Sequence, residues 1–385
     1  MAQPAELGGP APRLRVALVL DLAPRKLGSL ERWVVGVVRE ARGRGHRVDV
    51  LAREPLHPDV REALTSLGAG WERVDRLERN PVAAVARLRR YHVIQYHLFG
   101  ARSRAALFGY LAWPARIILV ERTSDWGSER TVFGRLKLRA LNLVSTPRIA
   151  GLIGVSDYAR DRTARLLGLP PERTATIYNG VDLDLFSFRS RSSVREGPIT
   201  LLAVAHLIPE KGIEHLLRAL AAVPPTSARL VLVGDGPEEA RLRRLGNELG
   251  IATRTRFCGL RDDVASLLQE ADVFVHPATW AEAFGWTIAE AMASGCAVIA
   301  TTVGGIPELI EHGRSGMLVP PGDPAALAET IVKLGDDVAW RLELGRNARR
   351  RAEERFGLVQ SARQHVDWFE RVARRGSRTE NGSGE

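Results

Sequence analysis

The stretch that decides the fold is residues 271–308, ADVFVHPATWAEAFGWTIAEAMASGCAVIATTVGGIPE. It opens with an apolar run, Ala271 to Pro277, that is typical of a buried strand. A loop carrying Glu282 follows, and then a short helix holding Glu290. A second apolar run covers Ala297 to Ala300, and a Gly-Gly-Ile-Pro-Glu turn closes the stretch. The pattern predicts a unit of strand, turn, helix and strand.

The start of this helix is a natural phosphate site. Backbone N–H groups at a helix start lack partners within the helix, and the helix dipole adds positive potential there. We expect a phosphate to bind at four consecutive residues: Phe284, Gly285, Trp286 and Thr287. Glu290, about one turn inside the helix, is placed to accept hydrogen bonds from ribose hydroxyls. Glu282 lies at the other end of the phosphate site, where a sugar would bind.

Two glutamates at this spacing mean little in a chain that is 26% charged, so the specificity comes from the whole string around them. The string Glu282-Ala-Phe-Gly-x4-Glu290-Ala-Met-Ala-x-Gly, with the later Gly-Gly-Ile-Pro-Glu turn, resembles the E-x7-E region of the retaining glycosyltransferases of family 4. The resemblance implies an α/β protein of the GT-B fold. Such a fold has two Rossmann-like domains facing a central cleft, and a C-terminal helix that crosses back to the first domain.

Length and composition agree with a two-domain globular protein. At 385 residues the chain is too long for one typical core. The only two cysteines, Cys258 and Cys296, predict no disulfide framework and favour a reducing cytoplasm. No apolar run reaches the ~18 to 20 residues of a membrane-spanning helix. We therefore expect a cytoplasmic protein, or one that rests on the inner surface of the membrane.

Changes in composition and pattern along the chain predict its domains. The segment 188–198 is polar, rich in Ser and Arg, and has no apolar period, which is typical of a linker. The expected segments are a disordered start over 1–14, an N-terminal acceptor domain over 15–187, this linker, a C-terminal donor domain over 199–356, a crossover helix over 357–375 and a disordered tail over 376–385.

In the first domain, site residues are expected where strands end. The loop after the first strand carries Gly28, where relatives usually have two adjacent glycines near the donor diphosphate, and a lone glycine often serves only the backbone. His97 ends a strand at the edge that faces a ligand in open α/β sheets, although a capping role explains it equally well. The strand Arg116 to Val120 delivers Glu121 and Arg122 to the same edge, and His97, Glu121 and Arg122 are the candidate acceptor contacts. Relatives often have a histidine near the acceptor here, and Arg122 is instead a candidate for holding an anionic group.

The resemblance places the remaining donor contacts in the second domain. Relatives hold the donor diphosphate with an arginine and a lysine, and this chain has His206 and Lys211 at those positions. Lysine is a mobile point charge suited to a phosphate, whereas histidine binds best when protonated. Further donor-binding residues implied by the family pattern are Asp235, Gly236, Leu260 and Arg261.

The resemblance implies transfer of a sugar from a UDP- or GDP-sugar to a hydroxyl acceptor, with retention at the anomeric carbon. Such chemistry serves the synthesis of cell-envelope glycans, polysaccharides or glycolipids. The expected catalytic residues are Glu282, Lys211, His206 and Arg122. No Asp-x-Asp motif of the metal-binding kind is recognised, so we predict a metal-independent enzyme without a cofactor. The alternatives are a sugar-nucleotide epimerase of the same fold, an inactive sugar-nucleotide-binding protein, and a glycosidase, which fits less well because it needs two carboxylates flanking one bond.

The expected partners are a nucleotide-sugar donor and a glycan or lipid-linked acceptor. The net charge of +10 would also suit nucleic acid or an anionic membrane. Arginine is spread through nearly every segment and no nucleic-acid-binding signature occurs, so nucleic acid is not expected. A peripheral contact of the basic first domain with an anionic membrane is a hypothesis. The sugar, the base and the oligomeric state stay open.

Overall fold

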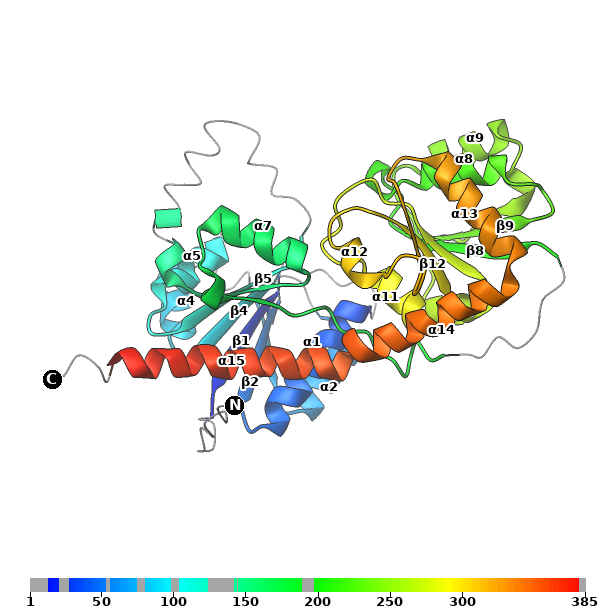
Figure 1. Ribbon diagram of the computed structural model, residues 1–385. Helices are drawn as coiled ribbons and strands as arrows, with labels where there is room; N and C mark the ends of the chain where they lie inside the picture. Colours follow the sequence, from blue (N-terminus) through cyan, green and yellow to red (C-terminus); the bar gives the residue numbers. More distant parts are fainter. Residues whose placement is uncertain are drawn as a thin grey trace, which may run out of the picture.

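The computed structural model describes residues 13–20, 28–52, 56–74, 80–97, 104–123, 142–143, 145–188 and 197–380. Most of the expected disordered start, most of the expected linker and the last five residues of the expected tail lie outside these ranges. Within them the chain forms two α/β domains, each built on a parallel sheet covered by helices (Figure 1). This arrangement confirms the predicted fold class.

The first domain contains a sheet of order β3-β2-β1-β4-β5-β6-β7. Its strands are β1 (Arg15–Leu20), β2 (Arg47–Ala52), β3 (Gly70–Arg73), β4 (Val93–His97), β5 (Arg116–Glu121), β6 (Ile149–Gly154) and β7 (Thr174–Thr176). Its helices are α1 (Ser29–Gly43), α2 (Pro58–Ser66), α4 (Pro81–Leu88), α5 (Arg104–Leu111) and α7 (Asp157–Leu167), with 3-10 turns η2 (Thr146–Arg148) and η3 (Pro171–Arg173). The central strands are apolar runs because helices cover both faces of a parallel sheet.

The second domain contains a sheet of order β10-β9-β8-β11-β12-β13. Its strands are β8 (Ile199–Val204), β9 (Ala228–Val233), β10 (Thr255–Phe257), β11 (Val273–His276), β12 (Ala297–Thr301) and β13 (Met317–Val319). Its helices are α8 (Ile213–Ala222), α9 (Glu239–Glu248), α10 (Val264–Glu270), α11 (Trp286–Ala293), α12 (Ile306–Leu309), α13 (Pro324–Asp336) and α14 (Val338–Arg355), with 3-10 turns η4 (Pro209–Lys211) and η5 (Ala252–Arg254). The predicted unit over 271–308 is thus β11, α11, β12 and the turn into α12.

The C-terminal helix α15 (Leu358–Glu380) crosses from the second domain back along the first, as predicted (Figure 1). It packs on α1, where the Trp33 indole N–H donates to the Ser361 hydroxyl over 3.1 Å. The helix continues five residues past the expected end at 375, so the expected disordered tail is wrong over 376–380. The helix passes through Gly376, because an isolated glycine costs only about 1 kcal/mol inside a helix and does not end it.

The two domains also contact each other directly, through the turn at the end of the 271–308 stretch. The Glu308 carboxylate accepts hydrogen bonds from the backbone N–H groups of Asp157 and Tyr158, at 2.7 and 2.8 Å. These N–H groups open α7, where a carboxylate satisfies unpaired donors and interacts well with the helix dipole. The Ser156 hydroxyl donates to the carbonyl of Ala283 over 2.5 Å. The turn therefore joins the domains next to the loop that carries Glu282.

No helix in the described part of the chain is long and apolar enough to cross a membrane.

Candidate active site

A cavity of about 320 Å³ lies between the two domains, at the edge where the parallel strands of each sheet end. The first domain contributes Arg122, which follows β5, and Asn179, which follows β7. The second domain contributes the loops after β8 and β11. Eight predicted site residues line this cavity: Arg122, His206, Lys211, Glu282, Phe284, Gly285, Trp286 and Thr287. In open α/β sheets, ligands bind where the parallel strands end, which we call the strand-end rule. This rule and the motif spacing thus indicate the same place.

Glu282 lies between the side chains of Lys211 and His276 on the wall of the cavity. Its carboxylate forms an ion pair with the Lys211 ammonium, and His276 Nε2 lies 3.3 Å from the same Oε1. Burial by itself would raise the pKa of Glu282, but the hydrogen bonds and charges of His276 and Lys211 outweigh burial and lower it to about 2. Glu282 is therefore ionised across the whole neutral range.

Two glycines let the backbone approach closely enough to build this part of the wall. Gly212, beside Lys211, has φ +65°, and a Cβ there would lie 2.0 Å from the Pro277 carbonyl oxygen. Gly304 has φ +57°, and a Cβ there would lie 2.2 Å from the Glu282 carbonyl oxygen. A side chain at either position would meet backbone, in a conformation that L-residues rarely adopt. These contacts hold the loops of Lys211 and Glu282 against each other.

The start of α11 forms the wall next to Glu282. Gly285 has φ +95° and caps the helix, whose first hydrogen bond is donated by the N–H of Ile288. The N–H groups of Trp286 and Thr287 precede that bond and belong to residues that line the cavity. Together with Lys211 they give the cavity the donors and the positive potential that a phosphate needs.

Glu290 does not line the cavity. Its side chain is buried, and the Ser29 hydroxyl at the start of α1 donates to Oε1 over 2.5 Å, across the domain interface. Its role as a ribose ligand stays a prediction, and a ribose would have to replace Ser29. Gly28 precedes Ser29 and caps α1, with its N–H donating to the Glu31 carboxylate over 2.9 Å. Gly28 likewise lies outside the cavity wall.

Of the other donor-site predictions, only His206 lines the cavity. His206 Nδ1 is 2.8 Å from the Asp235 carbonyl oxygen, so this nitrogen carries a proton that it donates. Gly236 is packed against the backbone of Leu207. The side chains of Leu260 and Arg261 are exposed or partly exposed, and Arg261 pairs with Asp263 at 2.5 Å. Asp235, Gly236, Leu260 and Arg261 do not line the cavity, so their donor contacts stay predictions.

Arg122 is the main charged group on the wall of the first domain. Its guanidinium carbon lies 4.1 Å from the centre of the Trp33 ring and 5.4 Å from that of Trp286, so it bridges the two domains. It also donates to the Asn179 side-chain oxygen. Burial lowers the pKa of Arg122 to about 9, yet the group stays protonated at neutral pH. One of its terminal nitrogens, Nη2, has no partner in the described part of the chain.

His97 lies behind Arg122 and not on the cavity wall. The Arg122 Nε–H donates to His97 Nδ1 over 3.2 Å, and the His97 ring packs against Trp33 with 5.1 Å between centroids. Burial, followed by the charge of Arg122, holds the pKa of His97 well below its ordinary value. His97 is therefore a neutral group that orients Arg122, and a direct contact with the acceptor is not what the geometry favours.

Glu121 is also directed away from the cavity. One of its carboxylate oxygens accepts from the Thr123 backbone N–H over 2.7 Å and from the Thr123 hydroxyl over 2.5 Å. The other accepts from the Thr163 hydroxyl over 3.1 Å. These bonds shape the turn that presents Arg122. The predicted acceptor contact of Glu121 therefore does not agree with its position.

Comparison with known proteins assigns the family. Residues 186–351 match the family model "Glycosyl transferases group 1", and residues 30–185 match the model "Glycosyltransferase Family 4". The phosphatidyl-myo-inositol mannosyltransferase of Mycobacterium leprae is 30% identical over 390 residues, which cover 95% of this chain and 99% of that protein. The chain belongs to glycosyltransferase family 4. The predicted resemblance is thereby confirmed.

Two further relatives show how far the likeness extends. An uncharacterized glycosyltransferase of Methanocaldococcus jannaschii is 29% identical over 245 residues, 60% of this family 4 chain and 63% of that protein. The chain thus matches less than two thirds of that relative's length. The crystal structure of HepE from Anabaena in complex with UDP has a TM-score of 0.77 at 24% identity, covering 92% of this chain and 99% of that one. It shows the GT-B fold.

Sequence reasoning missed four residues that shape the site of this family 4 protein: Ser29, Asn179, His276 and Glu308. His276 is the last residue of β11, so the strand-end rule that selected His97 applies to it equally. Asn179 opens an Asn-Gly-Val-Asp segment near the end of the first domain, and the strand-end rule does not select it because it lies three residues past β7. Ser29 and Glu308 act across the domain interface, and no signal within their own segments indicates that.

The described residues contain no group of three or more His, Cys, Asp or Glu side chains that could hold a metal ion. Metal independence stays a prediction.

Proposed function

We propose that this protein transfers a sugar from a nucleoside-diphosphate-sugar to a hydroxyl acceptor with retention of the anomeric configuration. The observation that supports this most strongly is the position of Glu282. Its carboxylate lies on one cavity wall with the Lys211 ammonium and the first N–H groups of α11. A diphosphate bound to the ammonium and the helix start would place its sugar against Glu282.

The donor side would work by electrostatic stabilisation of the leaving diphosphate. Lys211, the α11 N-terminus and the exposed His206 ring supply positive charge or hydrogen-bond donors where negative charge develops. Glu282 would bind sugar hydroxyls and stabilise the positive charge of an oxocarbenium-like transition state. A donor phosphate oxygen would take the acceptor proton as the new bond forms on the same face. No metal ion is required by this scheme.

The acceptor would enter from the first domain, past Arg122 and Asn179. We propose a glycan or glycolipid acceptor, in the synthesis of cell-envelope material in the cytoplasm. This is supported by the printed name of the Mycobacterium leprae relative, which is a mannosyltransferase for phosphatidyl-myo-inositol. The Anabaena structure with UDP supports a UDP-sugar as the first donor to test.

The test is a turnover screen of UDP-, GDP- and ADP-sugars in the presence of EDTA, comparing the wild type with Glu282→Gln and Lys211→Ala. We expect one donor to be hydrolysed slowly despite EDTA, and both variants to lose roughly 100-fold or more of that activity. The matched control is Glu329→Gln, which removes a carboxylate from an exposed Glu329–Lys333 pair on α13. Its turnover should equal that of the wild type.

Three outcomes would contradict the proposal. If a donor binds but its sugar is transferred neither to an acceptor nor to water, the protein is an inactive sugar-nucleotide-binding protein. Product from donor alone with an inverted sugar hydroxyl would indicate an epimerase. An inverted anomeric configuration in the product, read by nuclear magnetic resonance, would overturn retention.

A further inference from the structure

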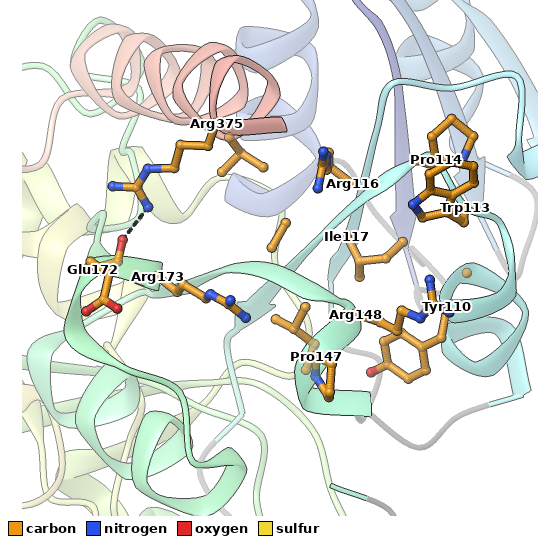
Figure 2. Close-up of a pocket in the computed structure, with 15 residues that line it drawn as sticks. Tyr110, Trp113, Pro114, Arg116, Ile117, Pro147, Arg148, Glu172, Arg173 and Arg375 are labelled. Atoms are coloured by element: carbon orange, nitrogen blue, oxygen red, sulfur yellow. Dashed lines mark hydrogen bonds between the residues drawn. The ribbon is translucent and has the colours of Figure 1, made fainter. Parts of the chain in front are cut away.

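A second cavity, of about 620 Å³, lies in the first domain at the edge of the sheet where its strands begin. Its walls come from the starts of β5 and β6, the turns η2 and η3, the end of α5 and the last part of α15 (Figure 2). The active-site cavity lies where the strands end. Because β5 and β6 are six residues long, about 20 Å of sheet separates the two cavities. The second cavity is therefore a separate site.

Four arginines from four different elements line this cavity. Arg116 is the first residue of β5, Arg148 ends η2, Arg173 ends η3 and Arg375 lies on α15 (Figure 2). Among the described residues that line it, Glu172 is the only acid. The four positive charges repel one another, and one negative charge offsets only part of that repulsion. A bound anion would relieve the rest.

Most of these guanidinium groups have no side-chain partner among the described residues. Arg375 donates to the Glu172 backbone carbonyl over 2.5 Å, a contact drawn as a dashed line in Figure 2. Arg116, Arg148 and Arg173 form no side-chain hydrogen bond or ion pair with any other described residue. Three guanidinium groups thus keep their donors for a ligand.

A neighbouring basic cavity of about 540 Å³ shows the contrast. There, Arg42 donates to the carbonyl oxygens of Leu67 and His46, and Arg87 pairs with Glu72. In that cavity, two of the five arginines already serve the fold.

Both cavities leave three arginines whose side chains have no partner among the described residues. In the neighbouring cavity these are Arg15, Arg47 and Arg90, and all three are exposed, whereas Arg116 and Arg173 in the cavity of Figure 2 are partly buried. Charges that are partly removed from water interact more strongly with an anion, which is why the cavity of Figure 2 is the stronger candidate for a ligand site.

We propose that the cavity lined by Arg116, Arg148, Arg173 and Arg375 binds a phosphate group, separate from the donor site. Guanidinium groups present paired donors that match phosphate oxygens, and such charge-assisted bonds are the strong ones. The phosphate could belong to a soluble phosphorylated compound or to a phospholipid headgroup. The indole of Trp113, which is 60% exposed, also lines the cavity and would contact whatever carries the phosphate.

The first arm of the test measures binding of inorganic phosphate and pyrophosphate by titration calorimetry, in the Lys211→Ala background that weakens the donor phosphate site. We expect Arg148→Ser/Arg173→Ser to bind at least about tenfold more weakly, because two charge-assisted contacts are lost. The matched control, Arg346→Ser/Arg350→Ser, removes the same charge from exposed positions on α14 in the other domain and should change nothing.

The second arm measures flotation with vesicles of phosphatidylglycerol and phosphatidylcholine in equal parts, against vesicles of phosphatidylcholine alone. Binding to the anionic vesicles that is lost in Arg148→Ser/Arg173→Ser and reduced in Trp113→Ala would assign the site to a phospholipid headgroup. Phosphate binding without flotation would assign it to a soluble compound. Either result supports the proposal.

The proposal is overturned if the cavity variant equals the α14 control in both arms. Unfolding curves guard against a folding defect, and Arg148→Lys/Arg173→Lys should restore part of the binding, because it returns the charge without the paired donors. The inference does not depend on the proposed transferase activity. Donor turnover should be unaffected by the cavity variant, so failure of one proposal does not imply failure of the other.

Discussion

On the wall of the cleft formed by the second domain, Glu282 lies between Lys211 and His276, so charges of both signs are paired within the protein. On the opposite wall, Arg122 lies between the rings of Trp33 and Trp286 and has no carboxylate partner in the described part of the chain. Both walls are buried, and only one is neutralised. A substrate group that carries negative charge is what the wall of the first domain lacks.

The difference has a physical consequence for each wall. A buried ion pair with additional hydrogen bonds offsets the cost of removing two charges from water, whereas a buried lone cation offsets it only through aromatic rings and neutral acceptors. The wall of the second domain is therefore organised before any ligand binds. The wall of the first domain holds the unpaired charge of Arg122, and a bound anion would recover part of its cost.

The largest change in stability is expected when the Glu282 carboxylate, which is paired with Lys211, becomes protonated. Because the pKa of Glu282 is lowered from 4.5 to about 2, its carboxylate stabilises the folded state fully above pH 4.5, and this contribution is lost as the pH falls toward 2. The shift corresponds to about 3 kcal/mol. Urea unfolding should therefore show wild type more stable than Glu282→Gln by about that amount near neutral pH, with the gap closing in acid.

The control for this experiment is again Glu329→Gln. Its free energy of unfolding should stay close to that of the wild type at every pH, because the Glu329–Lys333 pair is exposed. If the difference in unfolding free energy between wild type and Glu282→Gln stayed constant from neutral pH down to acid, the charge pairing of Glu282 would be contradicted. That result would mean that the lost stability comes from packing and not from the charge.

Arg122→Met sharpens the comparison on the other wall. Methionine keeps an unbranched apolar chain between the two indoles and removes the buried charge. The lost cation–π contacts cost about 1 to 2 kcal/mol and the removed desolvation returns a similar amount, so the free energy of unfolding should change by less than for Glu282→Gln. Transfer to an anionic acceptor should fall about tenfold or more, and donor hydrolysis should fall less.

Measuring transfer and hydrolysis side by side separates the two walls. Arg122→Lys should recover little of the transfer, because an ammonium cannot stack between indoles or donate to Asn179 and His97 in the same fork. Equal loss of hydrolysis and transfer in Arg122→Met would place Arg122 on the donor side and remove the distinction drawn between the walls.

The same contrast explains what could be predicted from sequence. The cleft wall of the second domain is built largely by one continuous stretch, so the spacing of Glu282, Gly285 and the apolar runs was enough to predict which residues lie together there, and the two-domain fold followed from the resemblance. Lys211 was placed by motif, but its pairing with Glu282 joins segments 71 residues apart. The cleft wall of the first domain depends on the packing of α15 and α1 behind β4, and no pattern within a single segment predicts that packing.

His97 illustrates the limit. The strand-end rule placed it correctly at the cleft edge of the sheet, yet Trp33 from α1 and His365 from α15 cover its ring, so it meets Arg122 and not the cavity. Glu290 also lies off the cavity wall, because Ser29 reaches it from the other domain, and its contact with a ribose stays a prediction. Burial by a distant element decides both cases, and sequence spacing carries no information about it.

The smallest effect is expected at the Ser29–Glu290 contact, which joins the two walls directly. If a donor ribose binds Glu290, it must displace the Ser29 hydroxyl, so Ser29→Ala removes a competitor and should tighten donor binding by a few-fold. Without donor, the variant should be less stable by about 1 kcal/mol, because the buried carboxylate loses its hydrogen bond from Ser29. Thermal unfolding with and without the nucleotide measures both effects, and Ser66→Ala, which removes an exposed hydroxyl bonded within α2, is the control. Donor binding that weakens in Ser29→Ala would instead make Ser29 part of the donor site, and the contact with Glu290 would then be a donor subsite shared by both domains.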